Sequence, residues 1–281
     1  MAVTRRYNRR LFLTHAGRVS AGLVVAGFAT GCATDGAGEV TDGAAVTPEP
    51  APAAPGSSPA ASTPPDSAAS TAPAQSEPAG TAFDWRRVNL GFVSAYVLVR
   101  ENQAVVVDTG SAGSEADIEE ALTALGLGWY AVEHVIFTHN HPDHIGSAPA
   151  VLEAATDAQA YAGEADLLAI NASREVTAVG DGDDVFGLQI ISTPGHTAGH
   201  ISVLDPVGGV LVAGDALVGA ADGGQVAGPD AAFTADMDMA LNSVRKLADL
   251  EFDTVLFGHG NPVEEGAGQQ VDALAERLSA G

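Results

Sequence analysis

Apolar side chains recur along this chain in two kinds of pattern. Short apolar runs predict strands at 94–100, 104–107, 132–137, near 158–161, and at 188–192, 201–204, 210–212 and 254–257. Longer segments, with apolar positions three or four residues apart, predict helices at 114–125, 144–155, 164–170, 236–250 and 269–278. Because strands and helices alternate along the chain, the pattern predicts an α/β fold of mixed sheets covered by helices.

The apolar pattern is absent before residue 82, apart from one short stretch near the N-terminus. Residues 33–81 consist mainly of Ala, Pro, Ser, Thr and Gly, and they contain nine of the 15 prolines but almost no large apolar side chain. Such a segment cannot bury enough apolar surface to offset the entropy that is lost on ordering. The sequence therefore predicts a disordered linker over 32–81 and one domain over 82–281.

The first 32 residues form a different kind of segment. They contain five arginines and no acidic residue, and the apolar stretch at 19–30 is too short to span a bilayer as a stable helix. Residues 8–14 resemble a twin-arginine export signal, and residues 29–32 resemble a lipoprotein cleavage box that ends at Cys32. We expect a signal peptide over 1–31, export, and attachment to the outer face of the cytoplasmic membrane through a lipidated Cys32. The alternative is an ordinary signal segment with a chance cysteine.

The charge of the chain narrows the range of partners. Beyond Cys32, 7 of the 12 basic side chains accompany all 36 acidic ones. So acidic a surface argues against nucleic acid, because binding a phosphate backbone needs a basic stripe. We therefore expect a small-molecule substrate. The acidic surface fits adaptation to high salt and equally an ordinary acidic soluble protein, and the sequence carries no signal for an oligomeric state.

Histidines are concentrated directly after one predicted strand. The segment His139-Asn140-His141-Pro142-Asp143-His144 follows the apolar run at 132–137. The end of a strand is where a rigid scaffold meets a loop, so side chains there can converge on one point. Imidazole and carboxylate are ligands that zinc favours, and the H-x-H-x-D-H spacing lets alternate side chains face one metal and the next two face another. This segment therefore predicts a metal site.

Four further motifs also place polar residues at the ends of predicted strands or in loops. They are Val106-Val107-Asp108-Thr109-Gly110, Thr193-Pro194-Gly195-His196-Thr197-Ala198-Gly199-His200, Ala213-Gly214-Asp215 and Phe257-Gly258-His259-Gly260. Together with the histidine segment, these motifs in this order resemble the metallo-β-lactamase superfamily over about residues 88–264. The resemblance implies an αββα sandwich of two mixed β-sheets flanked by helices.

The resemblance also implies a set of metal ligands. It assigns His139, His141 and His196 to a first metal, Asp143, His144 and His259 to a second, and Asp215 to a bridging position. The implied cofactor is a pair of zinc ions, with iron or manganese as alternatives. Each ligand histidine must be neutral and oriented by a partner, and Asp108 is the candidate for that support. We expect His200 to be structural and His134 to lie in the core or at the surface, and neither to be a metal ligand.

In the mechanism that the resemblance implies, a hydroxide that bridges the two metals attacks a carbonyl carbon. The first metal polarises the carbonyl oxygen, and Asp143 is the predicted catalytic residue that orients the nucleophile or relays its proton. The expected activity is hydrolysis of an ester, thioester or lactone.

Two features favour one branch of the superfamily. Asp215 follows a glycine, as in glyoxalase II-like and lactonase-like members, whereas true β-lactamases usually lack this aspartate. Only 22 residues follow His259, with Arg277 as the sole base, which disfavours a glutathione thioester. The alternatives are a β-lactam hydrolase, a mononuclear iron persulfide dioxygenase and a non-catalytic, metal-stabilised binding lipoprotein.

Two loops are expected to form the pocket. Residues 83–93, with Trp85 and Phe92, resemble the hairpin that covers the metals in this superfamily. The alternative is that these two aromatic residues pack against a sheet edge. Residues 219–234 are rich in Gly and Ala and are expected to form a rim.

Overall fold

The computed structural model describes residues 80–279. The expected signal peptide, Cys32 and nearly all of the expected linker lie outside the described residues. Among the described helices, none combines the length and the apolar character needed to cross a membrane.

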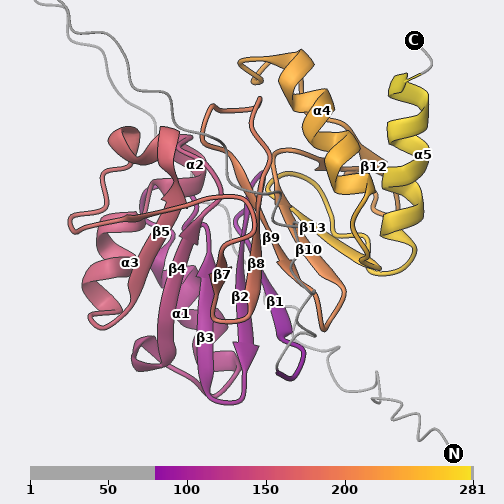
Figure 1. Cartoon of the computed structure of the whole chain (residues 1–281). Coiled ribbons are helices and arrows are strands. Elements are labelled where there is room, and N and C mark those ends of the chain that lie inside the picture. The colour runs from indigo at the N-terminus through magenta and orange to yellow at the C-terminus, as the bar shows by residue number, and fades with distance from the viewer. Residues whose placement is uncertain (1–79, 280–281) are drawn as a thin grey trace, which may run out of the picture. The chain divides into compact units, whose positions relative to one another are not determined.

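Two mixed β-sheets form the centre of the domain (Figure 1). The first has the order β1 (Asp84–Asn89), β2 (Ser94–Arg100), β3 (Gln103–Val107), β4 (Val132–Phe137), β5 (Gln159–Gly163) and β6 (Thr177–Val179). The second has the order β13 (Thr254–Phe257), β10 (Val210–Gly214), β9 (Ile201–Asp205), β8 (Leu188–Ser192) and β7 (Asp184–Val185). Strands β3 to β6 are parallel, as are β10 and β13, and the remaining pairs in these two sheets are antiparallel.

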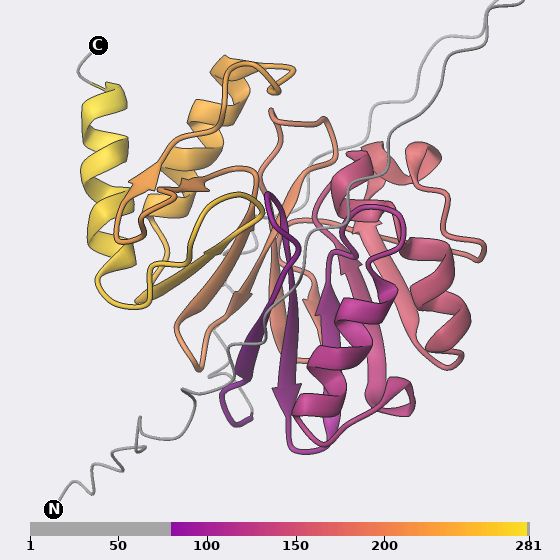
Figure 2. The same ribbon diagram turned by 180° about the vertical axis from the view of Figure 1, so that it is seen from behind.

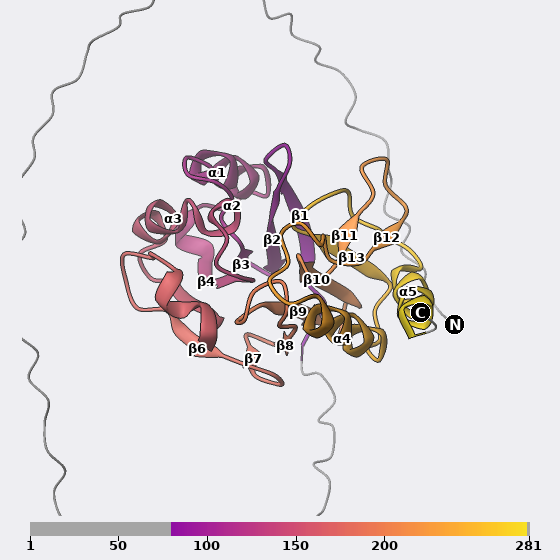
Figure 3. The ribbon, with the colours of Figure 1, turned by 90° about the horizontal axis from the view of Figure 1, so that it is seen from above.

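Helices cover the outer faces of both sheets, as Figures 2 and 3 show. Helices α1 (Glu115–Ala124), α2 (Pro142–Ile145) and α3 (Ala148–Ala154) lie on the side of the first sheet. Helices α4 (Met237–Ala248) and α5 (Ala267–Ser279) lie on the side of the second. The prediction of an αββα sandwich is confirmed.

Successive side chains of β3 point to opposite faces of the first sheet, and both faces are buried. Val105 and Val107 pack between the two sheets, in the cluster that contains Leu188 and Val203. Val106 belongs instead to the cluster that packs against the helices of the first sheet. Because both faces of the strand are buried from Ala104 to Val107, all four of these positions are apolar.

Helix 144–155 was predicted as one element, and the structure divides it. Pro149 lies in the first turn of α3, where its missing N–H cannot continue a helix from α2. Gly146 lies between the two helices, and a Cβ there would meet the Ala112 nitrogen and the Pro142 oxygen at 2.5 Å. The segment predicted as helix at 164–170 is a 3₁₀ helix, η2 (Glu164–Ala169).

Several short elements were not predicted from the sequence. They are β1, β6, β7, the 3₁₀ helix η1 (Trp129–Ala131) and the two-stranded sheet of β11 (Val218–Gly219) and β12 (Val226–Ala227). Most of these elements have only two or three residues, so no periodicity can develop along them.

The parallel pairs bring the motif-bearing strand ends to one side of the domain. Strands β3 and β4 end just before Asp108 and His139, and β10 and β13 end just before Asp215 and His259. Carboxyl ends of parallel strands share an edge, so the two sheets present these four residues to a common region.

Candidate metal centre

Seven histidine and aspartate side chains from four loops gather into two groups. In each group the possible ligand atoms all lie within 4.8 Å of one another. The first group consists of His139, His141, His196 and Asp215, and the second of Asp143, His144 and His259. The structure thus brings together all seven residues that the motifs suggested.

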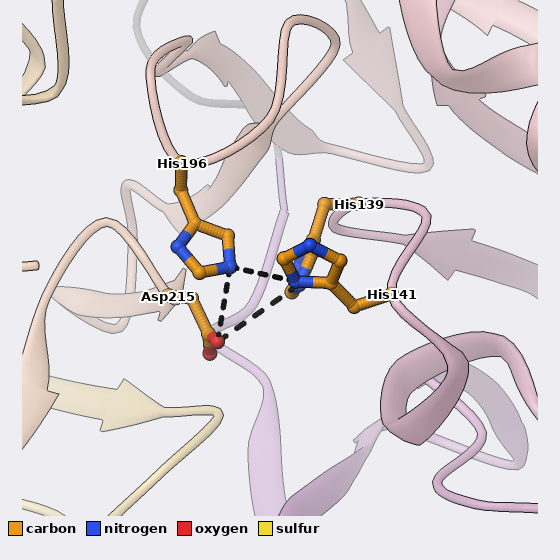
Figure 4. Close-up of side chains that lie close together, drawn as sticks. All are labelled: His139, His141, His196 and Asp215. Carbon is orange, nitrogen blue, oxygen red and sulfur yellow. Dashed lines mark hydrogen bonds and ion pairs between the residues drawn. The ribbon is translucent and has the colours of Figure 1, made fainter. Parts of the chain in front are cut away.

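The first group converges on a small volume (Figure 4). The Nδ1 atom of His141 lies 3.0 Å from Nε2 of His139 and 2.9 Å from Nε2 of His196. The Oδ2 atom of Asp215 lies 3.4 Å from Nε2 of His196 and 3.9 Å from Nε2 of His139. Three ring nitrogens and one carboxylate oxygen therefore face a common point.

The second group adjoins the first through Asp215. The Asp143 Oδ2 atom lies 3.3 Å from Nε2 of His259 and 3.9 Å from Nε2 of His144. The two Asp215 oxygens lie 3.2 Å from Nε2 of His259 and 3.5 Å from Nε2 of His144. Because Asp215 reaches members of both groups, it has the position of a bridging carboxylate.

Asp108 fixes the tautomer of one histidine in each group. Its Oδ2 atom accepts hydrogen bonds of 2.8 Å from Nδ1 of His144 and from the Thr138 hydroxyl. Because that hydroxyl donates to Asp108, it must accept from Nδ1 of His139, which lies 3.0 Å away. Both rings therefore carry a proton on Nδ1, and each turns its Nε2 toward the groups described above.

The other two Nε2 ligands are oriented in the same way by the pocket loops. His259 donates from Nδ1 to the Phe92 carbonyl at 2.8 Å. The Thr234 hydroxyl donates to the Asp230 carbonyl, so at 3.3 Å it accepts from Nδ1 of His196. Four rings thus present the nitrogen that binds a metal, each oriented by a partner of the kind that metal-binding histidines normally have.

The donor set and its unsatisfied atoms fit a pair of divalent cations. Nε2 of His144 and Oδ1 of Asp215 are buried without a hydrogen-bond partner among the described residues. Burial lowers the pKa of His139 well below its usual value and that of His196 to about 4, so both rings are neutral near pH 7. Neutral imidazole and carboxylate are the forms that bind zinc.

Carboxylates surround both histidines of the second group. Burial by itself lowers the pKa of His144, but the charge and hydrogen bond of Asp108, together with Asp215, raise it to about 10. Hydrogen bonds to Asp143 and Asp215 likewise raise the pKa of His259 to about 10. The neighbours that favour a proton on these rings would equally favour a metal cation in its place.

His200 supports Asp215 and is not a member of either group. Its Nε2 accepts from the Asp215 backbone N–H at 3.0 Å, so its proton lies on Nδ1, which donates to the Thr193 hydroxyl at 2.8 Å. That hydroxyl donates to Ser202, which donates to the Ala213 carbonyl. Burial lowers the pKa of His200 to about 3, which keeps the ring neutral, and the expectation of a structural role is confirmed.

Asp166 is a buried carboxylate that sequence reasoning missed. It accepts hydrogen bonds from the Asn140 N–H at 3.0 Å, the Thr197 hydroxyl at 2.6 Å and the Gly199 N–H at 2.8 Å. It therefore joins the loop of His139 and His141 to the loop of His196. The segment around it has no motif that could have marked it.

We expect an Asp166→Asn substitution to weaken metal binding about 10- to 100-fold, as loss of a ligand-orienting partner does. In either orientation of the asparagine amide, its NH₂ group would face an N–H or O–H donor, so at least one of the hydrogen bonds that join the two loops would be lost. Competition with a chromophoric chelator measures the affinity. The matched control is Asp205→Asn, because Asp205 is also buried but binds the N–H groups of Phe83 and Val207 instead. Equal losses of metal affinity in both variants would contradict this role.

A pocket of about 540 Å³ lies against the two groups. Phe92 lines it, as expected for the loop at 83–93, and the rim at 219–234 contributes Asp230 and Phe233. Trp85 was expected to share this place, but it packs against the apolar core between the sheets. The alternative expectation, packing against a sheet edge, therefore holds for Trp85, which lies in the end strand β1 of the first sheet.

Comparison with known protein sequences identifies the group to which these features belong. The signature of the metallo-beta-lactamase superfamily matches residues 88–259. The probable metallo-hydrolase YflN of Bacillus subtilis is 33% identical over 219 residues, which cover 62% of this chain and 82% of YflN. The hydroxyacylglutathione hydrolase of Aeromonas hydrophila is 31% identical over 166 residues, which cover 58% of each protein. The chain thus spans little more than half of that enzyme.

Comparison with solved structures concerns the fold. A metallo-beta-lactamase family protein of Thermus thermophilus superposes with a TM-score of 0.56 at 23% identity, covering 71% of this chain and 80% of that one. The metallo-beta-lactamase SMB-1, in complex with mercaptoacetic acid, gives a TM-score of 0.56 at 20% identity, covering 72% of this chain and 94% of that one. At these identities the likeness establishes a common fold.

Proposed function

This chain is a metallo-hydrolase of the metallo-beta-lactamase superfamily, and we propose that it uses two zinc ions to hydrolyse an ester, thioester or lactone. The observation that carries the proposal is the pair of ligand groups that share Asp215. His139, His141 and His196 would hold one metal, Asp143, His144 and His259 the other, and Asp215 both.

The open side of the site supports catalysis over a purely structural role. Structural zinc sites are normally closed cages of four protein ligands. Here His141, Asp143, His196, Asp215 and His259 all line the pocket, so metals held by them would be accessible to a substrate. This arrangement argues against the alternative of a metal-stabilised protein without activity.

When bound, such metals polarise a carbonyl oxygen and lower the pKa of water. The chain's own contribution is positional. Asp143 lies at the start of α2 and lines the pocket, and its Oδ2 atom faces His259 at 3.3 Å. A carboxylate in this place can orient an attacking water or accept its proton, so we propose Asp143 as the catalytic residue.

The complete second group favours this function over a mononuclear iron dioxygenase. A single iron would need ligands from the first group only. The convergence of Asp143, His144 and His259 would then have no role in metal binding. Several proteins of similar fold are described as β-lactamases, including SMB-1. Hydrolysis of β-lactams is therefore an outcome that the substrate screen must include.

The test is metal analysis of the purified full-length chain together with a substrate screen. We expect close to two zinc ions per chain, and hydrolysis of uncharged aryl esters, thioesters or lactones that disappears after chelation and returns with added zinc. A single bound iron and oxygen consumption with a persulfide would overturn the proposal. Turnover confined to β-lactams would correct the substrate class but keep the hydrolase.

A further inference from the structure

The outer wall of the pocket is apolar and aromatic. Phe92 and Phe233 line it, and their side chains are 66% and 69% exposed. The Phe92 ring stacks on the His259 ring, with ring centroids 6.1 Å apart and planes inclined by 15°. Large exposed apolar side chains at a concave site are typical of surface that a ligand covers. We therefore expect an apolar part of the substrate to lie close to the second ligand group.

Apart from the ligand histidines, the charged side chains of this pocket are all acidic. Asp143, Asp215 and Asp230 line it, and none of the described arginines or the lysine does. The base that reaches the loop of His259 is Arg87, whose guanidinium donates to Ser94, to the Gly260 carbonyl and to Asn261. Its hydrogen-bonding groups are therefore engaged by the protein.

Asp230 differs from the other two carboxylates of the pocket. Asp143 and Asp215 belong to the ligand groups, so bound divalent cations would more than offset their negative charge, whereas Asp230 belongs to neither group and would keep its own charge. Its Oδ1 accepts from the Ala232 N–H at 2.8 Å, which fixes the carboxylate in the turn that carries Phe233. Its Oδ2 makes no hydrogen bond to another described residue, so it is available to a ligand.

We propose that the pocket selects substrates that combine an apolar group with a positive charge, and that Asp230 is the specificity-determining residue. The apolar group would pack against Phe92 and Phe233, with the cationic group directed to the Asp230 carboxylate. Uncharged substrates of the same shape rank second and carboxylates last. The inference rests on the proposed hydrolase function, because it names the substrate class of that same site.

The test uses three aryl esters of equal length that end in trimethylammonium, tert-butyl or carboxylate. The first two groups have nearly the same shape and differ in charge. For the zinc-loaded full-length chain we expect kcat/KM to be about tenfold higher for the cationic ester than for its tert-butyl counterpart, and lower again for the carboxylate. Added salt should lower the ratio of kcat/KM between the cationic and the tert-butyl ester, because the Asp230 side chain lies at an exposed rim where salt screens its charge.

The decisive variant is Asp230→Asn, in which the asparagine oxygen can still accept from Ala232. We expect the ratio between the cationic and tert-butyl esters to fall to about one within this variant and to become insensitive to salt. The matched control is Asp222→Asn, which makes the same change of charge at an exposed residue that does not line the pocket. It should keep the parent ratio.

Binding of the corresponding ketones, which have no scissile bond, separates this inference from the proposed function. Calorimetry that gives the same charge order without any ester turnover would support the charge selection and overturn the hydrolase. If the chain hydrolyses all three esters without preferring the cationic one, or if Asp230→Asn leaves that preference intact, the proposed charge selection is overturned. The proposed hydrolase function would then still stand. Absence of both binding and turnover would overturn both.

Discussion

Replacing Asp215 by asparagine is expected to lower kcat/KM by at least about 100-fold, the upper end of the loss seen when only an orienting partner of a ligand is removed. The Asp215 Oδ2 atom faces His196 in the first ligand group and His259 in the second, and its Oδ1 atom faces His144 in the second. An asparagine offers one acceptor atom, and its NH₂ group would face a metal or a ligand histidine. The variant therefore loses the contacts of either Oδ1 or Oδ2, whichever way the amide turns.

Metal analysis and ester kinetics on the same preparation measure this effect. We expect the variant to hold fewer than two zinc ions per chain, and added zinc to restore little activity. Asp249→Asn is the control, because Asp249 is exposed at the end of α4, outside both ligand groups. A variant at Asp215 that retains two zinc ions and parent kinetics would show that this carboxylate does not bridge.

Replacing Asp108 by asparagine is expected to disturb both ligand groups at once. Its Oδ1 accepts from the Thr138 backbone N–H at 2.8 Å, so the asparagine must keep its oxygen on that side. Its NH₂ then faces Nδ1 of His144 and the Thr138 hydroxyl, where the carboxylate accepted. Both partners must now accept, so His144 and His139 would move their protons from Nδ1 to Nε2, the nitrogen that faces the metal.

The expected result for Asp108→Asn is an affinity for zinc that is about 10- to 100-fold weaker at each site, with a matching loss of activity at limiting zinc. Backbone strain is not the cause, since Asp108 has φ +61° and asparagine tolerates this left-handed conformation. Chelator competition gives the affinities, and histidine NMR reports the tautomers. Asp253→Asn is the control, because its Oδ1 accepts from the Gly266 N–H and an asparagine oxygen can do the same. Unchanged tautomers in the Asp108 variant would refute the argument.

Much of the architecture could be predicted from the sequence. Strands such as β2, β4 and β13 were predicted with their observed bounds, because largely buried strands leave short segments rich in apolar residues. The seven candidate ligands could also be named, because each lies in a short motif at the end of a strand or in a loop. Apolar segments and short ligand motifs are both local features, since each involves residues that are close together in the sequence. Such features can be recognised without knowing the tertiary structure.

The sandwich fold, the residues suited to hold metals and the acidic character of the chain could thus all be inferred from the order of its residues. How the remaining polar groups are used becomes clear when the packing of the sheets and loops is known. Asp166 meets Asn140 and Gly199 across 26 and 33 positions of the chain, and His259 meets the Phe92 carbonyl across 167. The position of Asp230 at the pocket likewise depends on residues that are far apart in the sequence and meet in the fold. Apolar periodicity records which side chains avoid water, but it carries no information about which distant polar atoms meet, because that depends on how the two sheets and their loops pack.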